Sequence, residues 1–205
     1  SLIDCGIDTS YVEETISATA QSVVLYDDSG KRQIYCDLKE IQDCSYDQEV
    51  FKEVIKDSLI VCLCNINFSR NLLKIARDKG KIIATDVQVL EDIYDAYNSD
   101  YMKYADILFL SNENIKGSVE EFAKGIAKEY DNEIIVIGLG SKGALLYVKR
   151  DNCIKKIRAV KTREVVNTIG AGDALFSCFI HYYSKNRNPY EALEKAVIFA
   201  SYKIG

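Results

Sequence analysis

A run of small residues that ends in an aspartate carries the most chemistry in this sequence. Gly170, Ala171 and Gly172 open a helical pattern after a short β-branched run, and Asp173 falls in the first turn of that helix. The first N–H groups of a helix have no partner within it, so small residues there predict an anion hole. A carboxylate repels bound phosphate, but it suits a general base for an attacking hydroxyl. An acid that only complements the helix dipole is the alternative for Asp173.

A second glycine-rich stretch, residues 138–143, has the G-x-G-x-x-G spacing of a dinucleotide-binding loop and comes after an apolar strand pattern. In a dinucleotide-binding fold this loop opens a helix whose N-terminus receives the pyrophosphate. Here the next residues, 144–148, are Ala-Leu-Leu-Tyr-Val and predict another strand. A nicotinamide-dependent oxidoreductase is therefore disfavoured. A nucleotide contact and a purely structural turn both remain open for this stretch.

Short apolar strands alternate with amphipathic helices around these two stretches, which predicts a doubly wound α/β fold. Parallel strands need crossover helices, so we expect a mostly parallel sheet covered on both faces. Ser118 and Glu121 are spaced as a capping box, and Asn188 before Pro189 is a typical helix start. Strands are expected at 59–64, 81–85, 107–110, 133–137, 144–149 and 153–160, and helices at 69–79, 119–130, from 171 and from 189.

The first 45 residues differ in pattern from the rest. Residues 22–27 and 31–36 are β-prone and flank Asp-Ser-Gly at 28–30, a turn composition that predicts a hairpin. We therefore divide the chain into a hairpin with its lead-in, residues 1–45, and an α/β core, residues 46–205. The sequence opens without the first strand and glycine-rich turn of such a sheet, so we expect that N-terminal strands are lacking.

The composition fits a globular protein and disfavours several partners. The 205 residues include 26 Lys and Arg and 31 Asp and Glu, a net charge of −5 that argues against nucleic-acid or membrane binding. No apolar run is long enough to span a bilayer, and a cytoplasmic location is expected. The seven cysteines form no C-x-x-C pair and are interpreted as reduced thiols, with Cys62 and Cys64 packed in the core. His181 is expected to pack or to lie at the surface.

The stretch from Asn167 to Phe176 resembles the second signature of the ribokinase, or PfkB, carbohydrate kinase family, written D-T-x-G-A-G-D. Further landmarks occur in family order, among them Gly6-Ile7-Asp8, Asn112-Glu113 and the final helix. The resemblance implies a ribokinase-like fold and an ATP-dependent transfer of the γ-phosphoryl group to a hydroxyl of a sugar or related small molecule. It also implies Mg²⁺, with K⁺ as a further cation.

The resemblance implies a role for each matching residue. Asp173 corresponds to the catalytic base, and Gly170, Ala171 and Gly172 to the anion hole. The hairpin would form part of a lid that closes over the substrate and pairs with another subunit, giving a homodimer. The positions implied near the nucleotide are Asn112, Gly140, Ser141, Lys142, Gly143, Thr168 and, beside adenine, Ser201; Asn167 is implied at a monovalent-cation site.

Three departures from the family pattern bear on the function. Ile115 stands where N-x-x-E has the glutamate that organises magnesium, and Asn167 stands where the family has an aspartate. The first family segment, which carries a sugar-binding aspartate, is absent from this chain. A non-catalytic nucleotide- or sugar-binding regulatory protein is therefore the alternative, although a pure binder has no need of Asp173 as a base. Hexoses, pentoses, sugar phosphates and nucleosides all remain open as acceptors.

Overall fold

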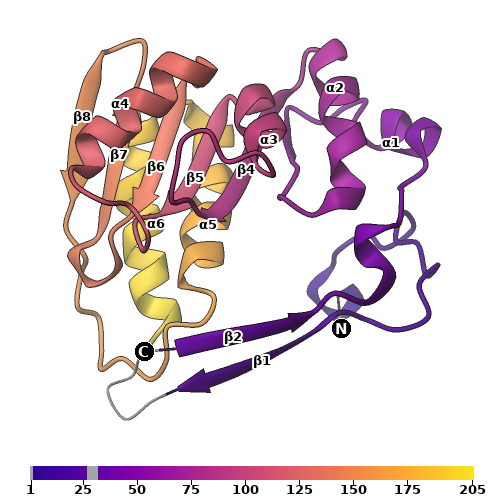
Figure 1. The fold of residues 1–205 in the computed structure, drawn as a ribbon, viewed down its shortest axis with the longest axis horizontal. Helices are drawn as coiled ribbons and strands as arrows, with labels where there is room; N and C mark the ends of the chain where they lie inside the picture. Colours follow the sequence, from indigo (N-terminus) through magenta and orange to yellow (C-terminus); the bar gives the residue numbers. More distant parts are fainter. Residues whose placement is uncertain (1, 27–31) are drawn as a thin grey trace.

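The computed structural model describes residues 2–26 and 32–205. It contains a six-stranded sheet with helices on both faces and a separate two-stranded sheet (Figure 1). The α/β, mostly parallel, ribokinase-like fold with a small second sheet is therefore confirmed. None of the helices in the described part of the chain has the length and apolar character needed to cross a membrane.

The large sheet has the strand order β3-β4-β5-β6-β7-β8. Its first four strands run parallel to one another, and β7 and β8 are antiparallel to their neighbours. β4 continues beyond the predicted end at Thr85, through a register shift between Asp86 and Val89. The strands are β3 (Ile60–Cys62), β4 (Ile82–Val89), β5 (Ile107–Ser111), β6 (Ile134–Gly138), β7 (Ala144–Val148) and β8 (Cys153–Ile157).

Helices cover both faces of this sheet and bury two apolar clusters. Alternate residues of β5 show the division: Leu108 faces the cluster under α1 to α4, and Phe109 faces the cluster under α5 and α6. Phe109 makes edge-on ring contacts with Phe176 and Phe179 of α5, at 5.1 and 5.2 Å between centroids. The helices are α1 (Gln48–Val54), α2 (Arg70–Asp78), α3 (Ser99–Tyr104), α4 (Val119–Tyr130), α5 (Ala171–Asn186) and α6 (Pro189–Lys203).

The starts of α4 and α6 have the predicted capping residues. The Ser118 hydroxyl accepts from Glu121 N at 3.3 Å at the start of α4. The Asn188 side chain accepts from the backbone N–H groups of Tyr190 and Glu191, at 3.1 and 3.2 Å. The cap of α6 thus fixes the direction of the last helix, whose C-terminal end lies beside the start of α5.

The hairpin pairs β1 (Gln21–Tyr26) with β2 (Arg32–Asp37) in antiparallel register. The turn predicted at 28–30 lies outside the described residues. Four large apolar side chains of the hairpin are exposed, namely Val23, Leu25, Ile34 and Tyr35. The structure also has the short 3-10 turns η1 (Ile3–Cys5), η2 (Lys39–Gln42), η3 (Asn67–Ser69) and η4 (Gly140–Lys142).

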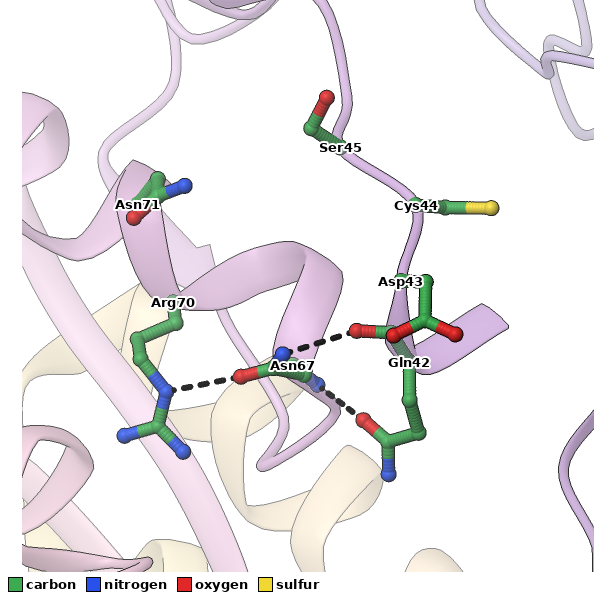
Figure 2. Close-up of a pocket in the computed structure, with 7 residues that line it drawn as sticks. All are labelled: Gln42, Asp43, Cys44, Ser45, Asn67, Arg70 and Asn71. Carbon is green, nitrogen blue, oxygen red and sulfur yellow. Dashed lines mark hydrogen bonds between the residues drawn. The ribbon is translucent and has the colours of Figure 1, made fainter. Parts of the chain in front are cut away.

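A pair of amides ties the end of the hairpin segment to the core (Figure 2). Asn67 donates from its backbone N–H to the Gln42 side chain at 3.0 Å, and from its side chain to Gln42 O at 2.8 Å. Arg70 Nε donates to Asn67 Oδ1 at 3.0 Å. Beside this pair lies an open polar hollow of about 460 Å³ that is also lined by Asp43 and Asn71. The Arg70 guanidinium is already bonded to Asp100 and Tyr97 O, so it is not free to bind an anion in the hollow.

The predicted core packing of two cysteines is wrong. Cys62 and Cys64 are exposed, because they lie on the face of the edge strand β3 opposite to Val61 and Leu63, which are buried in the first cluster. Neighbouring protein atoms still remove enough water for burial to raise the pKa of Cys62 to about 11. All seven cysteines are free, as expected of reduced thiols. His181 lies at the surface against the Tyr182 ring.

Candidate active site

The start of α5 forms a tight turn, here called the Gly170 turn (residues 167–173). Gly170 is left-handed, with φ 75° and ψ 10°, and precedes the first helical residue. The Asn167 side-chain oxygen accepts from Ile169 N at 2.9 Å, and Ala171 N donates to Thr168 O at 3.2 Å. These two bonds shape the turn from within, so Asn167, Thr168 and Gly170 to Asp173 are brought together as the sequence predicts.

The Gly170 turn leaves backbone donors open. The N–H groups of Gly170, Gly172 and Asp173 make no hydrogen bond to any residue that the structure describes. The N–H of Ala171 is occupied by Thr168 O, so the open donors are not the set expected from the sequence. Gly172 and Asp173 are exposed. An anion placed at this helix start would meet unpaired N–H groups and the positive end of the helix dipole.

A second carboxylate, which sequence reasoning missed, faces the same space from β4. Asp86 is 8% exposed, and burial raises the pKa of its carboxyl, with the negative charge of Asp173 raising it further. A bond from Gln88 N to Asp86 Oδ1 at 2.8 Å opposes this effect. Its position at the carboxyl end of a parallel strand was the available signal, because ligands of open α/β sheets bind there.

Cys64 lies at the carboxyl end of the neighbouring strand and belongs to the same corner. Burial is the main reason that the pKa of its thiol is raised, and the charges of Asp86 and Asp173 add to that effect. The thiol also takes a hydrogen bond from the backbone of Asp86. Two strands and one helix therefore place a thiol and two carboxylates around one corner of the sheet.

The other glycine-rich stretch, here called the Gly143 turn (residues 138–143), is built differently. Leu139 N donates to Gly143 O at 2.8 Å, and Gly143 N donates to Gly140 O at 3.1 Å. Gly143 has φ 102°, and a Cβ there would lie 1.9 Å from Ile157 O. The glycine is therefore required by the close approach of β8. Ser141 and Lys142 are exposed on this turn and available to a ligand.

Asn112 comes directly after β5 and lies next to the end of β6, since its N–H donates to Gly138 O at 3.0 Å. Ile115, three residues on, packs against the first apolar cluster instead of offering a carboxylate. No group of three His, Cys, Asp or Glu side chains suited to a metal ion occurs in residues 2–26 and 32–205. Mg²⁺ is commonly bound by one or two carboxylates together with substrate phosphates, and the Asp86 carboxylate meets that lesser requirement.

Ser201 and Asn167 have their side chains engaged within the protein. The Ser201 hydroxyl donates to Val160 O and lies 3.2 Å from Thr162 Oγ1. A contact from Ser201 to adenine would compete with these bonds. The Asn167 oxygen is taken by Ile169 N, and it would have to accept this bond while binding a cation.

Solved structures share this fold. A microbiome-derived acarbose kinase matches with a TM-score of 0.80 at 23% identity, over 92% of this chain and 63% of that protein. A ribokinase from Thermotoga maritima matches with a TM-score of 0.69 at 21% identity, over 90% of this chain and 63% of that protein. The chain therefore has an α/β, ribokinase-like fold.

The sequence comparisons give the family. The model of the pfkB family of carbohydrate kinases matches residues 1–205, and the chain belongs to this family. A ribokinase of Dictyostelium discoideum is 26% identical over 175 residues, which cover 74% of this chain and 55% of the relative. A deoxyribokinase of Salmonella typhi is 39% identical over 70 residues, which cover 34% of this chain and 22% of the relative. The chain thus spans about half or less of these relatives.

Proposed function

We propose that this chain is the nucleotide-binding and catalytic part of an ATP-dependent kinase that phosphorylates a hydroxyl of a sugar or related small molecule. The observation that carries the proposal is the Gly170 turn, where unpaired N–H groups and the Asp173 carboxylate lie together at one helix start. Membership of the pfkB family supports the reaction class. The names of the relatives support a sugar as the acceptor.

In the proposed reaction, the N–H groups of Gly170, Gly172 and Asp173 hold oxygens of the transferred phosphoryl group. Asp173 takes the proton from the acceptor hydroxyl. The acceptor oxygen forms a bond to the γ-phosphorus, and the bond from that phosphorus to the bridging oxygen of ADP breaks. Donors fixed in place before reaction stabilise the charge that develops on the phosphoryl oxygens. Mg²⁺ would supply further charge neutralisation on the phosphates, and Asp86 would help to hold it.

The remaining predicted positions complete the nucleotide side of the proposal. Asn112 approaches the phosphates from the end of β5, and the Gly143 turn lies beside the nucleotide through Gly140, Ser141, Lys142 and Gly143. Thr168 lies beside the phosphates, and Ser201 lies beside the adenine. A monovalent cation such as K⁺ binds near Asn167. The hairpin covers the substrate as a lid and pairs with a second copy, and the protein acts in the cytoplasm without nucleic-acid or membrane partners.

The alternative is a protein that binds nucleotide or sugar without transferring phosphate. Ile115, packed in the apolar cluster, favours it, because the family glutamate that organises magnesium is missing there. Asp173 favours the kinase. An exposed carboxylate beside unpaired donors weakens anion binding, so it would be a disadvantage in a protein that only binds, whereas a kinase uses it as the base.

The test is an assay of sugar-phosphate and ADP formation with Mg·ATP over a panel of hexoses, pentoses and nucleosides. For the best acceptor, Asp173→Asn should lower kcat by about 10²–10⁴, or roughly 3–5 kcal/mol, while the Kd for Mg·ATP stays the same or falls, because a charge that repels the phosphates is removed. Glu191→Gln is the matched control, since Glu191 is a first-turn acid of α6. Turnover that survives in Asp173→Asn would reject the base, and Mg·ATP binding without transfer to any acceptor would favour the alternative.

A further inference from the structure

A lysine from the last helix reaches the Gly170 turn. A Cβ built on Gly170 would lie 3.8 Å from Lys203 Cε, 4.0 Å from Lys203 Nζ and 3.9 Å from Asp173 Oδ2. The ammonium group of α6 and the carboxylate of α5 therefore flank the same glycine. Lys203 and Gly170 are far apart in sequence, and no motif links them.

Lys203 has no competing partner in the part of the chain that the structure describes. It forms no ion pair within 4.0 Å and no hydrogen bond there, whereas several other lysines pair with carboxylates, such as Lys149 with Asp131 at 2.6 Å. A lysine in the last turn of a helix often only complements the helix dipole. Its placement against the open donors of a neighbouring helix start goes beyond that role.

The position of Lys203 is fixed by a segment here called the strap (residues 158–166), which leads from β8 to the Gly170 turn. The strap binds three carbonyls at the end of α6: Thr162 Oγ1 donates to Ser201 O at 3.1 Å, Arg163 to Tyr202 O at 3.2 Å and Val166 N to Ile204 O at 2.8 Å. Arg163 also stacks on the Tyr202 ring at 3.8 Å. The backbone that carries Lys203 is therefore tied to the turn that its side chain approaches.

We propose that Lys203 is a further catalytic residue, which contacts the phosphate oxygens of the nucleotide at the Gly170 turn. This inference rests on the proposed function. The local charge supports it, because Asp86 and Asp173 both face this corner and would repel the phosphates of ATP. An unpaired ammonium beside Gly170 offsets that repulsion where negative charge spreads over the transferred group.

The experiment compares Lys203→Gln, Lys203→Arg and Lys195→Gln by Mg·ATP and adenosine binding and by phosphoryl transfer. Lys195 is an exposed lysine two turns earlier on α6 and serves as the matched control. We expect Lys203→Gln to weaken Mg·ATP binding about tenfold and to lower kcat by about 10²-fold, with adenosine binding unchanged. Lys203→Arg should keep most of the Mg·ATP affinity and most of kcat, and Lys195→Gln should match the wild type in each.

The outcomes separate this inference from the proposed function. If the wild type binds and uses Mg·ATP but Lys203→Gln does so equally well, the role of Lys203 is rejected and the kinase stands. Equal losses for Mg·ATP and adenosine would also reject it, because they would indicate a general disturbance of the site. A wild type that binds no Mg·ATP contradicts the proposed function and this inference together. A higher salt concentration should weaken Mg·ATP binding by the wild type more than binding by Lys203→Gln. This difference in salt dependence would support the contact.

Discussion

The two glycine-rich turns have similar compositions but opposite uses of the backbone. In the Gly143 turn the N–H groups of Leu139, Lys142 and Gly143 bond to carbonyls of the turn itself. In the Gly170 turn the N–H groups of Gly170, Gly172 and Asp173 find no partner among the described residues. The Gly143 turn uses these three donors within itself, whereas the Gly170 turn presents its open donors at the start of a helix.

Glycine content alone therefore does not identify a binding loop, because the element after the loop decides whether open donors lie at the positive end of a helix dipole. A strand comes after the Gly143 turn, so its polar groups enter the ladder between β6 and β7. A helix comes after the Gly170 turn, and the first N–H groups of a helix have no partner within it. Substitutions in and around the two turns can break or sharpen this difference.

The largest effect on stability is expected at Gly143. A Cβ there would meet Ile157 O at 1.9 Å and Ala159 N at 2.6 Å, so β8 would have to move. Gly143→Ala should lower the free energy of unfolding by about 3 kcal/mol or more. Gly172→Ala is the contrast, since a Cβ there meets nothing within 4 Å and should change stability by less than about 1 kcal/mol. Urea unfolding of both variants measures the difference, and equal stabilities would contradict it.

A matched pair of left-handed glycines separates backbone strain from function. Gly140 has φ 58° and Gly170 has φ 75°, and both have room for a Cβ at van der Waals distance or beyond. Each change to alanine should cost about 1–2 kcal/mol of unfolding free energy. Gly170→Ala should also weaken Mg·ATP binding more strongly than Gly140→Ala, because the open donors of the Gly170 turn lie at a helix start and are proposed to hold the transferred phosphoryl group. Calorimetric titration of both variants would contradict this account if Gly140→Ala lost more affinity.

The buried carboxylate of Asp86 predicts a pH-dependent stability. Burial raises its pKa in the folded state, so the charged form destabilises the fold above that pKa and the effect is absent below the unfolded pKa. Asp86→Asn should be more stable than the wild type at neutral pH, because it removes the buried charge. The advantage should shrink as pH falls through the raised pKa and vanish below about pH 4. Thermal unfolding over this range is the measurement, and an advantage that grows on acidification would contradict the cause.

The smallest effect is expected at Arg163, which holds the end of α6 from the strap. Its stacking on Tyr202 is exposed to solvent, and such contacts contribute about 0.5–1 kcal/mol. Arg163→Ala should therefore weaken Mg·ATP binding a few-fold, by loosening the turn that carries Lys203. Lys161→Ala removes a charge from the same strap and should have no effect. If Lys161→Ala lost as much Mg·ATP affinity as Arg163→Ala, the effect would come from the positive charge of the strap and not from the stacking on Tyr202.

Much of the fold can be predicted from the sequence, because local signals and global packing agree. The pattern predicts a helix over 119–130 with a Ser118 cap, and α4 has these bounds. The prediction fails for Cys62 and Cys64, because an alternating apolar pattern shows which residues share a face of a strand but not whether a helix covers that face. Nothing in the local pattern marks β3 as the edge of the sheet.

The site is predictable only where its residues are contiguous. The sequence points to Asp173 and its glycines, because a helix start is a local feature. Asp86 and Lys203 come from β4 and α6, and their approach to the Gly170 turn depends on strand order and on the strap. Hydrogen bonds also decide which N–H groups stay open: the Ala171 N–H is expected to be free, but Thr168 O takes it.

Residue-resolved NMR of the backbone amides during titration with a non-hydrolysable Mg·ATP analogue and with AMP tests the central claim most directly. The Gly170 turn should bind the terminal phosphate, so the amide signals of Gly170, Gly172 and Asp173 should shift with the ATP analogue and much less with AMP. The Leu139 and Gly143 amides are bonded within their own turn, which is proposed to lie beside the nucleotide and not at its terminal phosphate, so any shift there should be similar with the two ligands. Shifts confined to residues 138–143, or equal shifts at the Gly170 turn with both ligands, would contradict the account.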